Sequence, residues 1–507
     1  MKKGQTYEGV VEKIDFPNVG QVRVDGEASL VQIKNVLPGQ RVRFVVNKFR
    51  NGQAKGRLLE VVEKSPWETR EKVCNIFPSC GGCLYQTFDY EKQLEIKEQQ
   101  VKETLDKAID YVYDFAKILP APSEFQYRNK MEFSFGDDRK DGPLTLGLHK
   151  RASTYDILTA DDCQLVHEDM TKVLACILVF FRERNIPYYK KMSHEGILRH
   201  LVLRRGERTG ELLVNLVTTS QTILPITAQE VPYEQQRKVP LQVKKEEVTR
   251  KQMEIIEQRQ GIQRIQQLDM DLSSLVEDLR NLDLEGEIVG ITHIINDSLS
   301  DVVKCDELRL LYGRDFLYDR LFALQFKISP FSFFQPNTKG AELIYTKVKE
   351  YLGDVKDKVI YDLFSGTGTI SQVLASEAKA VIGVEIVAEA VEAAKENAKL
   401  NGLQNCYFIA GDVLEVLDTL TSIPDVIVLD PPRDGIHPKA LPKVIALNCP
   451  KIVYVSCKVT SLARDLVALH QAGYRVEKAT CIDQFAQTAH VEAVVLLARV
   501  EALSSRF

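Results

Sequence analysis

Two short apolar runs in the C-terminal third constrain the fold most, because each leads directly into residues that can carry chemistry. Residues 425–429 and 451–455 are largely apolar and rich in β-branched side chains, which is typical of buried parallel strands. The first run is followed by Asp430-Pro431-Pro432-Arg433 and the second by Ser456-Cys457. The carboxyl ends of parallel strands line the ligand crevice of an open sheet. We therefore expect Asp430 and Cys457 to face one shared pocket.

A glycine-containing turn earlier in the same region favours a nucleoside ligand. From about residue 331 strands and helices alternate, and the strand at 359–363 ends in Phe364-Ser365-Gly366-Thr367-Gly368. Glycines at such a turn let the backbone approach a ligand closely. The next strand ends at Glu385, which is placed to accept hydrogen bonds from ribose hydroxyls. Dinucleotide-binding domains share this pattern, but Ser371 replaces their third glycine and favours a cofactor without pyrophosphate.

Length and charge predict several domains in an α/β chain. A chain of 507 residues is too long for one ordinary core. Residues 1–62 contain eleven Lys or Arg and six Asp or Glu, a net charge of +5, although the whole chain carries −5. Five short strands punctuated by turns predict a small oligonucleotide-binding (OB-like) β-barrel there. Its candidate phosphate contacts are Arg41, Arg43, Lys48, Arg50, Lys55 and Arg57. The alternative is a merely solvated barrel face.

Four cysteines in the middle of the chain predict a metal centre. Cys74, Cys80 and Cys83 lie within ten residues, and Cys163 is a fourth candidate. Thiolates are soft ligands that suit iron-sulfur clusters or zinc, and the Cys80-Gly81-Gly82-Cys83 turn lets two sulfurs converge. Spacing alone does not separate a [4Fe-4S] cluster from a four-cysteine zinc site. The remaining cysteines are assigned to packing: Cys176, Cys305, Cys406, Cys449 and Cys481.

Residues 63–330 are predicted to form a central mixed α+β domain with a helical insertion at about 228–268. A helix is expected near residues 90–110, followed mainly by strands. Leucines and an isoleucine at an alternating three-four step run from Ile265 to Leu282, which indicates a helix packed on its own domain or a short seam for a partner. Six basic residues in this part are candidates for contact with folded RNA, or are exposed strand faces: Arg128, Lys130, Lys150, Arg151, Arg204 and Arg205.

The start of the chain and its hydropathy predict a cytoplasmic protein. The first residues lack the apolar core of a signal peptide, and no run of about eighteen apolar residues occurs. We expect a monomer that does not contact a membrane.

The motifs together resemble the RNA (uracil-5-)-methyltransferase family over nearly the whole chain. The resemblance rests on the four cysteines, Phe333-Phe334-Gln335-Pro336-Asn337, the turn at 362–368, Asp430-Pro431-Pro432-Arg433, Ser456-Cys457 and His490-Val491-Glu492. The most similar members act on 23S ribosomal RNA and carry an iron-sulfur cluster and an N-terminal RNA-binding barrel called a TRAM domain. The resemblance implies a Rossmann-like class I methyltransferase domain at 331–507, with an antiparallel last strand that places Glu492 in the shared pocket.

The resemblance also implies residue roles. Gln335, Phe364, Glu385 and Asp430 are expected to contact S-adenosylmethionine, with Cys457 as nucleophile and Glu492 as base. The thiolate would add to carbon 6 of a uridine flipped out of its stack, so that carbon 5 can take the methyl group. Phe333 is a candidate to stack on the uracil. Lys458-Val459 and Phe485-Ala486 depart from the family pattern in the loops that flank the site.

Other functions fit fewer of these features. Transfer RNA is the nearest alternative substrate. An RNA cytosine-5 enzyme would carry a second cysteine where this chain has Pro431-Pro432. An NAD-dependent oxidoreductase would leave Cys457 and Glu492 without a role, and a non-catalytic iron-sulfur RNA-binding protein would explain only the N-terminal half.

Overall fold

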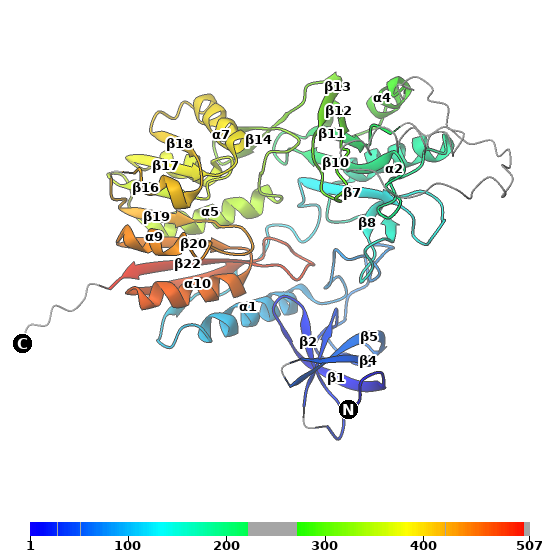
Figure 1. Cartoon of the computed structure of the whole chain (residues 1–507), viewed down its shortest axis with the longest axis horizontal. Coiled ribbons are helices and arrows are strands. Elements are labelled where there is room, and N and C mark those ends of the chain that lie inside the picture. The colour runs from blue at the N-terminus through cyan, green and yellow to red at the C-terminus, as the bar shows by residue number, and fades with distance from the viewer. Residues whose placement is uncertain (28, 51, 222–270, 421, 501–507) are drawn as a thin grey trace, which may run out of the picture.

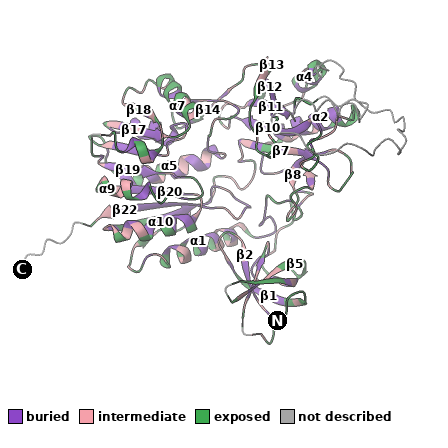
Figure 2. Cartoon of the chain, viewed as in Figure 1, coloured by how far each residue is buried: buried purple, intermediate pink, exposed green. Residues whose placement is uncertain are grey.

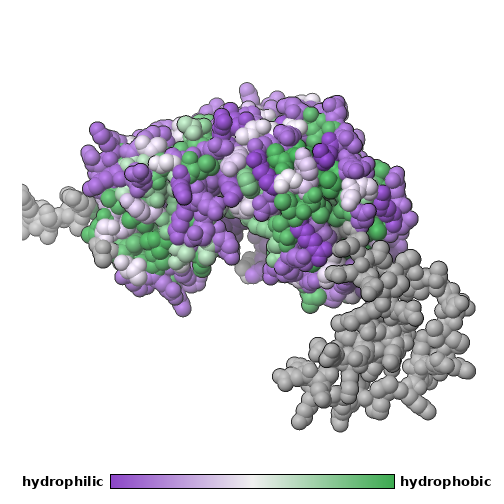
Figure 3. Space-filling view, turned by 90° about the horizontal axis from the view of Figure 1, so that it is seen from above, coloured by the Kyte–Doolittle hydropathy of each residue, from purple (hydrophilic) through white to green (hydrophobic). Residues whose placement is uncertain are grey.

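The computed structural model describes residues 1–27, 29–50, 52–221, 271–420 and 422–500. Figure 1 shows a small barrel at the N-terminus, a central sheet, and a larger C-terminal sheet covered by helices. Seen from above, the surface is hollowed between the two larger sheets (Figure 3). None of the described helices is long and apolar enough to span a membrane. The predicted insertion at 228–268 lies outside the described residues.

The first 63 residues form a closed five-stranded barrel, as predicted. Its strands pair in the order β1-β2-β3-β5-β4, with bounds β1 Thr6–Asp15, β2 Val19–Arg23, β3 Val31–Lys34, β4 Arg41–Arg50 and β5 Gln53–Glu63. Alternate residues of β4 point inward, and Val42, Phe44 and Val46 are fully buried. This two-residue alternation fills the inside of a small barrel with apolar side chains. The assignment of the barrel to the TRAM class stays a prediction.

The central sheet has seven strands in the order β13-β12-β11-β10-β7-β8-β9. The strands span β7 Lys130–Gly136, β8 Thr145–His149, β9 Ile157–Thr159, β10 Leu198–Arg205, β11 Glu211–Thr218, β12 Glu287–Ile295 and β13 Glu307–Gly313. Helices α2 (Glu168–Glu183) and α4 (Ser273–Arg280) pack on it. Leu275 and Leu279 of α4 are buried in this core, so the described end of the predicted leucine seam packs on its own domain.

The C-terminal sheet has eight strands in the order β18-β17-β16-β19-β20-β22-β21-β6. Its strands span β16 Val359–Leu363, β17 Ala380–Glu385, β18 Cys406–Ala410, β19 Val426–Leu429, β20 Lys451–Ser456, β21 Tyr474–Ile482 and β22 Glu492–Arg499. The helices are α5 Thr338–Leu352, α6 Thr369–Ala375, α7 Ala388–Leu400, α8 Val413–Val416, α9 Leu441–Ala446 and α10 Val459–Gln471. Strands β16 to β20 are parallel and β22 is antiparallel to β20, as expected. Figure 2 shows that these central strands are largely buried.

An N-terminal segment completes this C-terminal sheet. Helix α1 (Tyr90–Asp106) packs against α10, and the two-residue strand β6 (Asp114–Phe115) pairs with β21 at the edge of the sheet. A hairpin of β14 (Leu317–Leu321) and β15 (Leu324–Ile328) joins the central sheet to the C-terminal sheet and its helices. The chain therefore crosses between the two large sheets more than once. The domain boundaries at residues 62 and 330 remain a prediction.

Candidate active site

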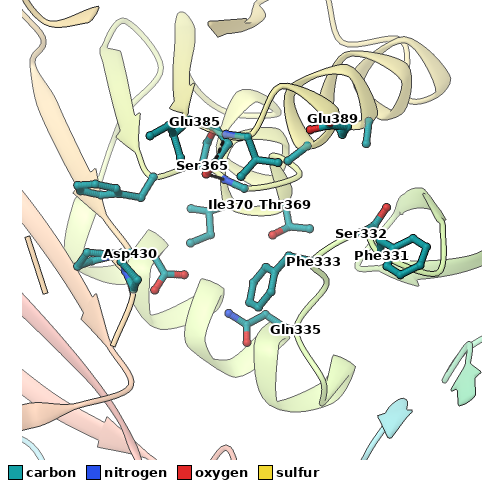
Figure 4. Close-up of a pocket in the computed structure, with 18 of the residues that line it drawn as sticks. Phe331, Ser332, Phe333, Gln335, Ser365, Thr369, Ile370, Glu385, Glu389 and Asp430 are labelled. Carbon is teal, nitrogen blue, oxygen red and sulfur yellow. Dashed lines mark hydrogen bonds between the residues drawn. The ribbon is translucent and has the colours of Figure 1, made fainter. Parts of the chain in front are cut away.

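A cavity of about 1360 Å³ opens at the carboxyl ends of the parallel strands. It is lined by every residue for which the sequence predicts a catalytic or cofactor contact, namely Gln335, Phe364, Glu385, Asp430, Cys457 and Glu492. Figure 4 shows Phe333, Gln335, Ile370 and Asp430 around one shared space. Phe333 is 60% exposed, and it lines the cavity.

Strand register explains why Cys457 and Glu492 meet. Cys457 follows directly after β20, whose last residue, Ser456, pairs with Ala493 of the antiparallel strand β22. Glu492 is the first residue of β22, so it lies beside the end of β20. Asp430 follows β19, the parallel neighbour of β20 on its other side. Three reactive groups from three adjacent strands thus enter one cavity at the same edge of the sheet.

Burial raises the pKa values of all three groups in the ligand-free protein. Burial, followed by the charges of Glu492 and Asp430, raises the pKa of Cys457 to about 11, whereas Arg433 opposes the change. Burial, followed by the charge of Asp430, also raises the pKa of Glu492 well above its ordinary value. Burial and the charge of Asp362 raise the pKa of Asp430 to about 7. Strongly perturbed groups that share a cleft are typical of a reactive site.

The charge of the lining favours a cationic ligand. Seven carboxylates line the cavity, against the two cations Lys327 and Arg433. The carboxylates are Glu385, Glu389, Glu392, Glu396, Asp412, Asp430 and Glu492. Opposite charge stabilises an ion most strongly where water is partly excluded. A sulfonium or ammonium group therefore fits this lining better than a phosphate or pyrophosphate does.

The turn after β16 forms a cradle that a nucleoside can occupy. Gly368 has φ 73°, and a Cβ at this position would lie 2.5 Å from the Phe408 ring, so only glycine fits without a rearrangement. Glu385 accepts hydrogen bonds from the backbone N–H groups of Gly366 (3.0 Å) and Val387 (2.9 Å). Ser365 also lines the cavity, and its hydroxyl oxygen is buried without a hydrogen-bond partner among the described residues.

The loop that precedes Glu492 is held from the opposite end of the chain. The Lys97 ammonium of α1 donates to Asp483 Oδ1 at 2.6 Å and to the carbonyl of Phe485 at 3.2 Å. Tyr90 donates its hydroxyl to Asp483 Oδ2 at 2.9 Å. We call residues 483–491 the base loop. Further contacts reach it from the Gln93 amide, the Tyr127 hydroxyl and the backbone N–H groups of Leu84 and Tyr85.

Sequence reasoning missed this loop support and the position of Arg433. Lys97 lies on a helix whose buried face also carries Gln93 and Gln100, and this polar pattern was the available signal. Arg433 belongs to the predicted motif but received no role, although its side chain hydrogen-bonds Cys457 and lowers the pKa of that thiol. The sequence did contain a signal for this role. Arg433 follows one predicted strand and Cys457 follows the next, and a nearby cation stabilises a thiolate.

The four clustered cysteines are all buried and lie near one another. Burial raises the pKa of Cys83 to about 12, with smaller contributions from the other three thiols, and burial raises the pKa of Cys163 to about 11. Arg151 donates to the backbone carbonyls of Cys80 and Cys83 and so fixes the turn between them. The thiols are thus close, but no three His, Cys, Asp or Glu side chains in the described part of the chain are arranged to hold a metal ion.

Two predictions about individual residues were wrong. Cys305 is exposed and lines the catalytic cavity instead of packing in a core. Arg204 and Arg205 are buried in β10, whose residues are buried along its whole length, so neither is free to bind RNA. Arg204 donates to the carbonyl of Pro330 at 3.1 Å, and Arg205 pairs with Asp169 at 3.1 Å.

Comparison with known proteins agrees with the fold and places the chain in a family. The sequence profile of the tRNA (Uracil-5-)-methyltransferase family matches residues 298–500. An uncharacterized RNA methyltransferase of Clostridium tetani is 44% identical over 99% of this chain and 100% of its own length. Another, from Halalkalibacterium halodurans, is 31% identical over 98% of each chain. The crystal structure of Pyrococcus abyssi tRNA (uracil-54, C5)-methyltransferase in complex with S-adenosyl-L-homocysteine is 24% identical, with a TM-score of 0.69 over 97% of this chain and 99% of that chain. These relationships, together with the cavity at the strand ends, show that the chain belongs to the RNA (uracil-5-)-methyltransferase family.

Proposed function

We propose that this protein methylates carbon 5 of a uridine in 23S ribosomal RNA with S-adenosylmethionine as methyl donor, which makes 5-methyluridine. The observation that carries the proposal is the entry of Cys457 and Glu492 into one cavity from adjacent antiparallel strands. Two such groups can act on the same pyrimidine ring. The acidic lining provides the environment that a sulfonium donor needs.

Cys457 is the nucleophile. Carbon 5 of uracil is a weak nucleophile, so the thiolate first forms a bond from its sulfur to carbon 6, and the ring electrons move onto carbon 5 and the carbonyl at carbon 4. The thiol must lose its proton before this step. Its pKa of about 11 in the ligand-free protein means that ionisation depends on what enters the cavity. Arg433 already favours the thiolate, and a bound cation favours it further.

S-adenosylmethionine supplies an electrophilic methyl group when bound. Gln335, Phe364, Glu385 and Asp430 are the proposed contacts, and all four line the cavity. One oxygen of Glu385 accepts from Gly366 and the other from Val387, so each still has a lone pair that can accept from a ribose hydroxyl.

Glu492 is the base that completes the reaction. After methylation, carbon 5 carries both the methyl group and its original proton. Glu492 takes this proton, the bond from carbon 6 to sulfur breaks, and its electron pair returns to the Cys457 sulfur. A carboxylate whose pKa is raised by burial is a stronger base once it is ionised. It acts as a base only in this ionised form, which the positive charge of the bound donor favours before the methyl group is transferred.

The uridine must leave its stack to reach this cavity. Groups buried at strand ends cannot reach carbon 6 inside an RNA helix, so the substrate nucleotide is flipped out or already single-stranded. Phe333 is the proposed stacking partner for the uracil, because its ring lines the cavity and is 60% exposed. Aromatic rings of this kind stack on unpaired bases.

Ribosomal RNA is favoured over transfer RNA by the four cysteines, which resemble those of the ribosomal RNA enzymes of the family. Transfer RNA is the second candidate, because the matching family profile carries that substrate in its name. Nucleoside mass spectrometry of ribosomal and transfer RNA from a deletion strain separates the two. Loss of one 5-methyluridine from 23S ribosomal RNA supports the proposal, and loss from transfer RNA alone contradicts it.

We further propose that Cys74, Cys80, Cys83 and Cys163 hold a [4Fe-4S] cluster, with zinc as the alternative. Burial of four neighbouring thiols supports this assignment, because buried thiols with raised pKa values release their protons when a cation binds. The side chains must still converge for four bonds to form. Iron, sulfide and zinc analysis of protein purified without oxygen tests it, and stoichiometric zinc without iron contradicts the cluster.

The proposed division into domains follows from these roles. Residues 1–62 form the RNA-binding barrel, residues 63–330 the central domain and residues 331–507 the methyltransferase domain. The RNA partner is ribosomal RNA, and we propose that the protein acts as a monomer in the cytoplasm.

A further inference from the structure

The catalytic cavity cannot by itself account for affinity for RNA. Its seven carboxylates against two cations repel a phosphate backbone. A second cavity, beside β11, has its cations neutralised by ion pairs, which are Arg205–Glu285, Arg208–Glu342 and Lys339–Glu207. Most of the affinity of RNA-binding proteins comes from cations on phosphates. The cations that bind the substrate must therefore lie elsewhere.

A third cavity, of about 850 Å³, has the required charge. Seven cations and two carboxylates line it. The cations are Lys34, Arg57, Lys64, Arg70, Lys72, Lys150 and Arg151, and the carboxylates are Glu68 and Glu71. We call this cavity the basic groove. It lies between the barrel and the cysteine-containing segment that follows it (Figure 1).

We propose that a single-stranded segment of the RNA substrate docks in the basic groove while the target uridine occupies the catalytic cavity. This proposal rests on the proposed function and adds the surface that holds the strand beside the modified base. Its partner is an unpaired RNA backbone whose bases face an apolar wall.

The groove has two walls from different parts of the chain. One wall is the side of β5 that carries the exposed residues Arg57, Leu59 and Val61, next to Lys34 of β3. Lys34 and Arg57 each follow one step after the paired residues Ile33 and Gly56, so they lie side by side on parallel strands. The other wall is formed by residues 77–79 and 150–152.

Three of the groove cations are free to bind phosphates. Lys34, Arg57 and Lys64 are exposed, and the structure gives them no ion pair with any described residue. Lys72 donates to the backbone carbonyl of Asn75 and keeps its full charge. Charges of this kind contribute fully to counterion release when RNA binds.

Two other cations support the groove instead. Arg70 pairs with Glu124 at 2.6 Å. Arg151 donates hydrogen bonds to the backbone carbonyls of Pro78, Cys80 and Cys83. Burial lowers the pKa of its guanidinium. These contacts fix the wall that carries the cysteines. The basic groove therefore contains cations that are unpaired among the described residues and can bind phosphates, and other cations whose contacts hold its walls in place.

Apolar side chains beside the free cations distinguish this groove from a plain phosphate site. Leu59 is 45% exposed and Val61 is 40% exposed, although both lie on a strand of a small barrel. Neighbouring exposed apolar side chains on one strand form a small apolar patch, and such patches can serve as interaction sites. An unpaired strand presents base faces as well as phosphates, so it fits a cationic groove with an apolar wall better than a duplex does.

The basic groove and the catalytic cavity lie on two sides of the base loop. Leu84 lines the groove, and its backbone N–H donates to the carbonyl of Gln487 at 2.7 Å. Phe485 and His490 of the same loop line the catalytic cavity. A strand held in the groove therefore contacts the segment that supports the base loop, which is the arrangement a shared substrate requires.

Two of the barrel cations predicted from sequence, Arg41 and Arg43, and also Arg23, are already paired with carboxylates. Arg43 pairs with Glu8 at 2.6 Å and also with Glu60, and Arg41 pairs with Glu63 at 3.7 Å. Arg23 pairs with Glu12 at 2.9 Å. Each of these cations sits beside a carboxylate that offsets its charge. Of the predicted phosphate contacts, Arg57 is the one that lines the basic groove.

The test compares two triple variants that each remove three positive charges. K34Q/R57Q/K64Q empties the groove of its free cations, and R23Q/R41Q/R43Q is the matched control. The full-length proteins are titrated with a labelled 15-nucleotide unpaired RNA and with a hairpin of the same length, from low to moderate salt. Because each lost phosphate contact lowers the salt slope by about 0.7 for single strands, the slope of the groove variant should fall by about 2 and its affinity by more than tenfold.

The control should bind the unpaired RNA within about twofold of the wild type and keep its salt slope. Equal losses in both variants, an unchanged groove variant, or a loss seen only with the hairpin would each overturn the proposal. The proposal would also be wrong if the wild type, but not the groove variant, bound a protein partner instead of RNA. Binding is measured without methyl donor, so a wild-type protein that binds but fails to methylate uridine contradicts the proposed function and not the groove.

Discussion

The Lys97 ammonium lies 2.6 Å from the Asp483 carboxylate, and both side chains are completely shielded from solvent. The two residues are 386 positions apart in sequence, yet their contact fixes the start of the base loop that ends at Glu492. A buried ion pair costs desolvation energy that its attraction only partly offsets. We infer that the pair is retained because it defines the position of the loop.

Replacing Lys97 by Met should leave the Asp483 charge buried and unpaired. We expect a loss of about 3–5 kcal/mol in the free energy of unfolding, measured by urea denaturation. The Lys102→Met variant is the control, because Lys102 lies on the same helix but forms an exposed pair with Asp106. That variant should lose no more than about 1 kcal/mol. Equal stability of the two variants would contradict the role of the buried pair.

The double variant K97M/D483L separates stability from loop position. Removing both charges should recover most of the lost stability, because a well-packed apolar pair often replaces a buried ion pair without loss. If the ion pair positions the base loop, release of methylated RNA should remain slow while formation of the covalent adduct is normal. Recovery of wild-type turnover in this variant would show that the pair serves stability alone.

Asp430 should make the ligand-free protein less stable as the pH rises. Its folded pKa is raised to about 7, so folding favours the protonated form. This contribution to stability is complete below the pKa of the group in the unfolded chain, which is about 4. It is lost as the pH rises through the folded pKa of about 7. Asp430→Asn should therefore have the same melting temperature as the wild type at pH 4 and one roughly 10 °C higher at pH 8. A pKa difference of about three between the folded and the unfolded chain is worth roughly 4 kcal/mol, and about 1 kcal/mol corresponds to about 2–4 °C in a domain of this size.

The Asp430→Asn variant should also bind S-adenosylmethionine more weakly, measured by calorimetry at pH 8. The control is S-adenosylhomocysteine, which lacks the sulfonium charge and should lose less affinity. Higher stability together with lower donor affinity is the combination expected of a carboxylate kept for function. A melting temperature below that of the wild type at pH 8 would argue against the raised pKa.

Cys457 should become more reactive when a cation fills the cavity. In the ligand-free protein its pKa of about 11 keeps the thiol protonated at pH 8, so alkylation by iodoacetamide should be slow. A donor analogue with an ammonium group in place of the sulfonium should lower this pKa and so raise the thiolate fraction. If the pKa falls by about one unit, the thiolate fraction and therefore the alkylation rate should rise about tenfold. Peptide mass spectrometry distinguishes Cys457 from the exposed Cys305. Equal rates with the charged and uncharged analogues would contradict this electrostatic effect.

Glu385 should contribute to donor binding through its remaining lone pairs. The Glu385→Gln variant keeps an acceptor oxygen but replaces the other oxygen with a donor, which faces the N–H of Gly366 or Val387. We expect a tenfold or greater loss in affinity for S-adenosylmethionine, measured by calorimetry, with little change in the rate of adduct formation at saturating donor. Glu389→Gln, in the same cavity lining but on α7, is the matched control. Equal losses in the two variants would mean that Glu385 acts only through the general charge of the cavity.

The regular parts of the fold could be predicted from sequence because they depend on local periodicity. The alternation in residues 41–46 defines an inward face of the barrel, and the apolar runs at 426–429 and 451–455 can only be buried strands. The candidate site followed from two rules, since parallel strand ends share a crevice and an antiparallel last strand begins where they end. Asp430, Cys457 and Glu492 were placed in one pocket by these rules and by the family resemblance.

The features that sequence reasoning missed depend on contacts between distant segments. Strand β6 has only two residues and no period to detect. Lys97 looks like a solvated helical lysine until Asp483 is folded against it. Arg204 and Arg205 look exposed by residue type, but β10 is covered on both faces. The basic groove likewise joins cations from residues 34 to 151, which no local pattern brings together.

The most direct test is the adduct formed by the Glu492→Gln variant with a uridine-containing RNA and S-adenosylmethionine. This variant keeps the nucleophile but cannot remove the proton from carbon 5, so a covalent complex should accumulate. Peptide mass spectrometry should find the modified RNA attached at Cys457, with one methyl group added to the uracil. Rapid release of methylated RNA, or attachment at Cys305 or any other residue, would contradict the claim that Cys457 and Glu492 act on the same ring.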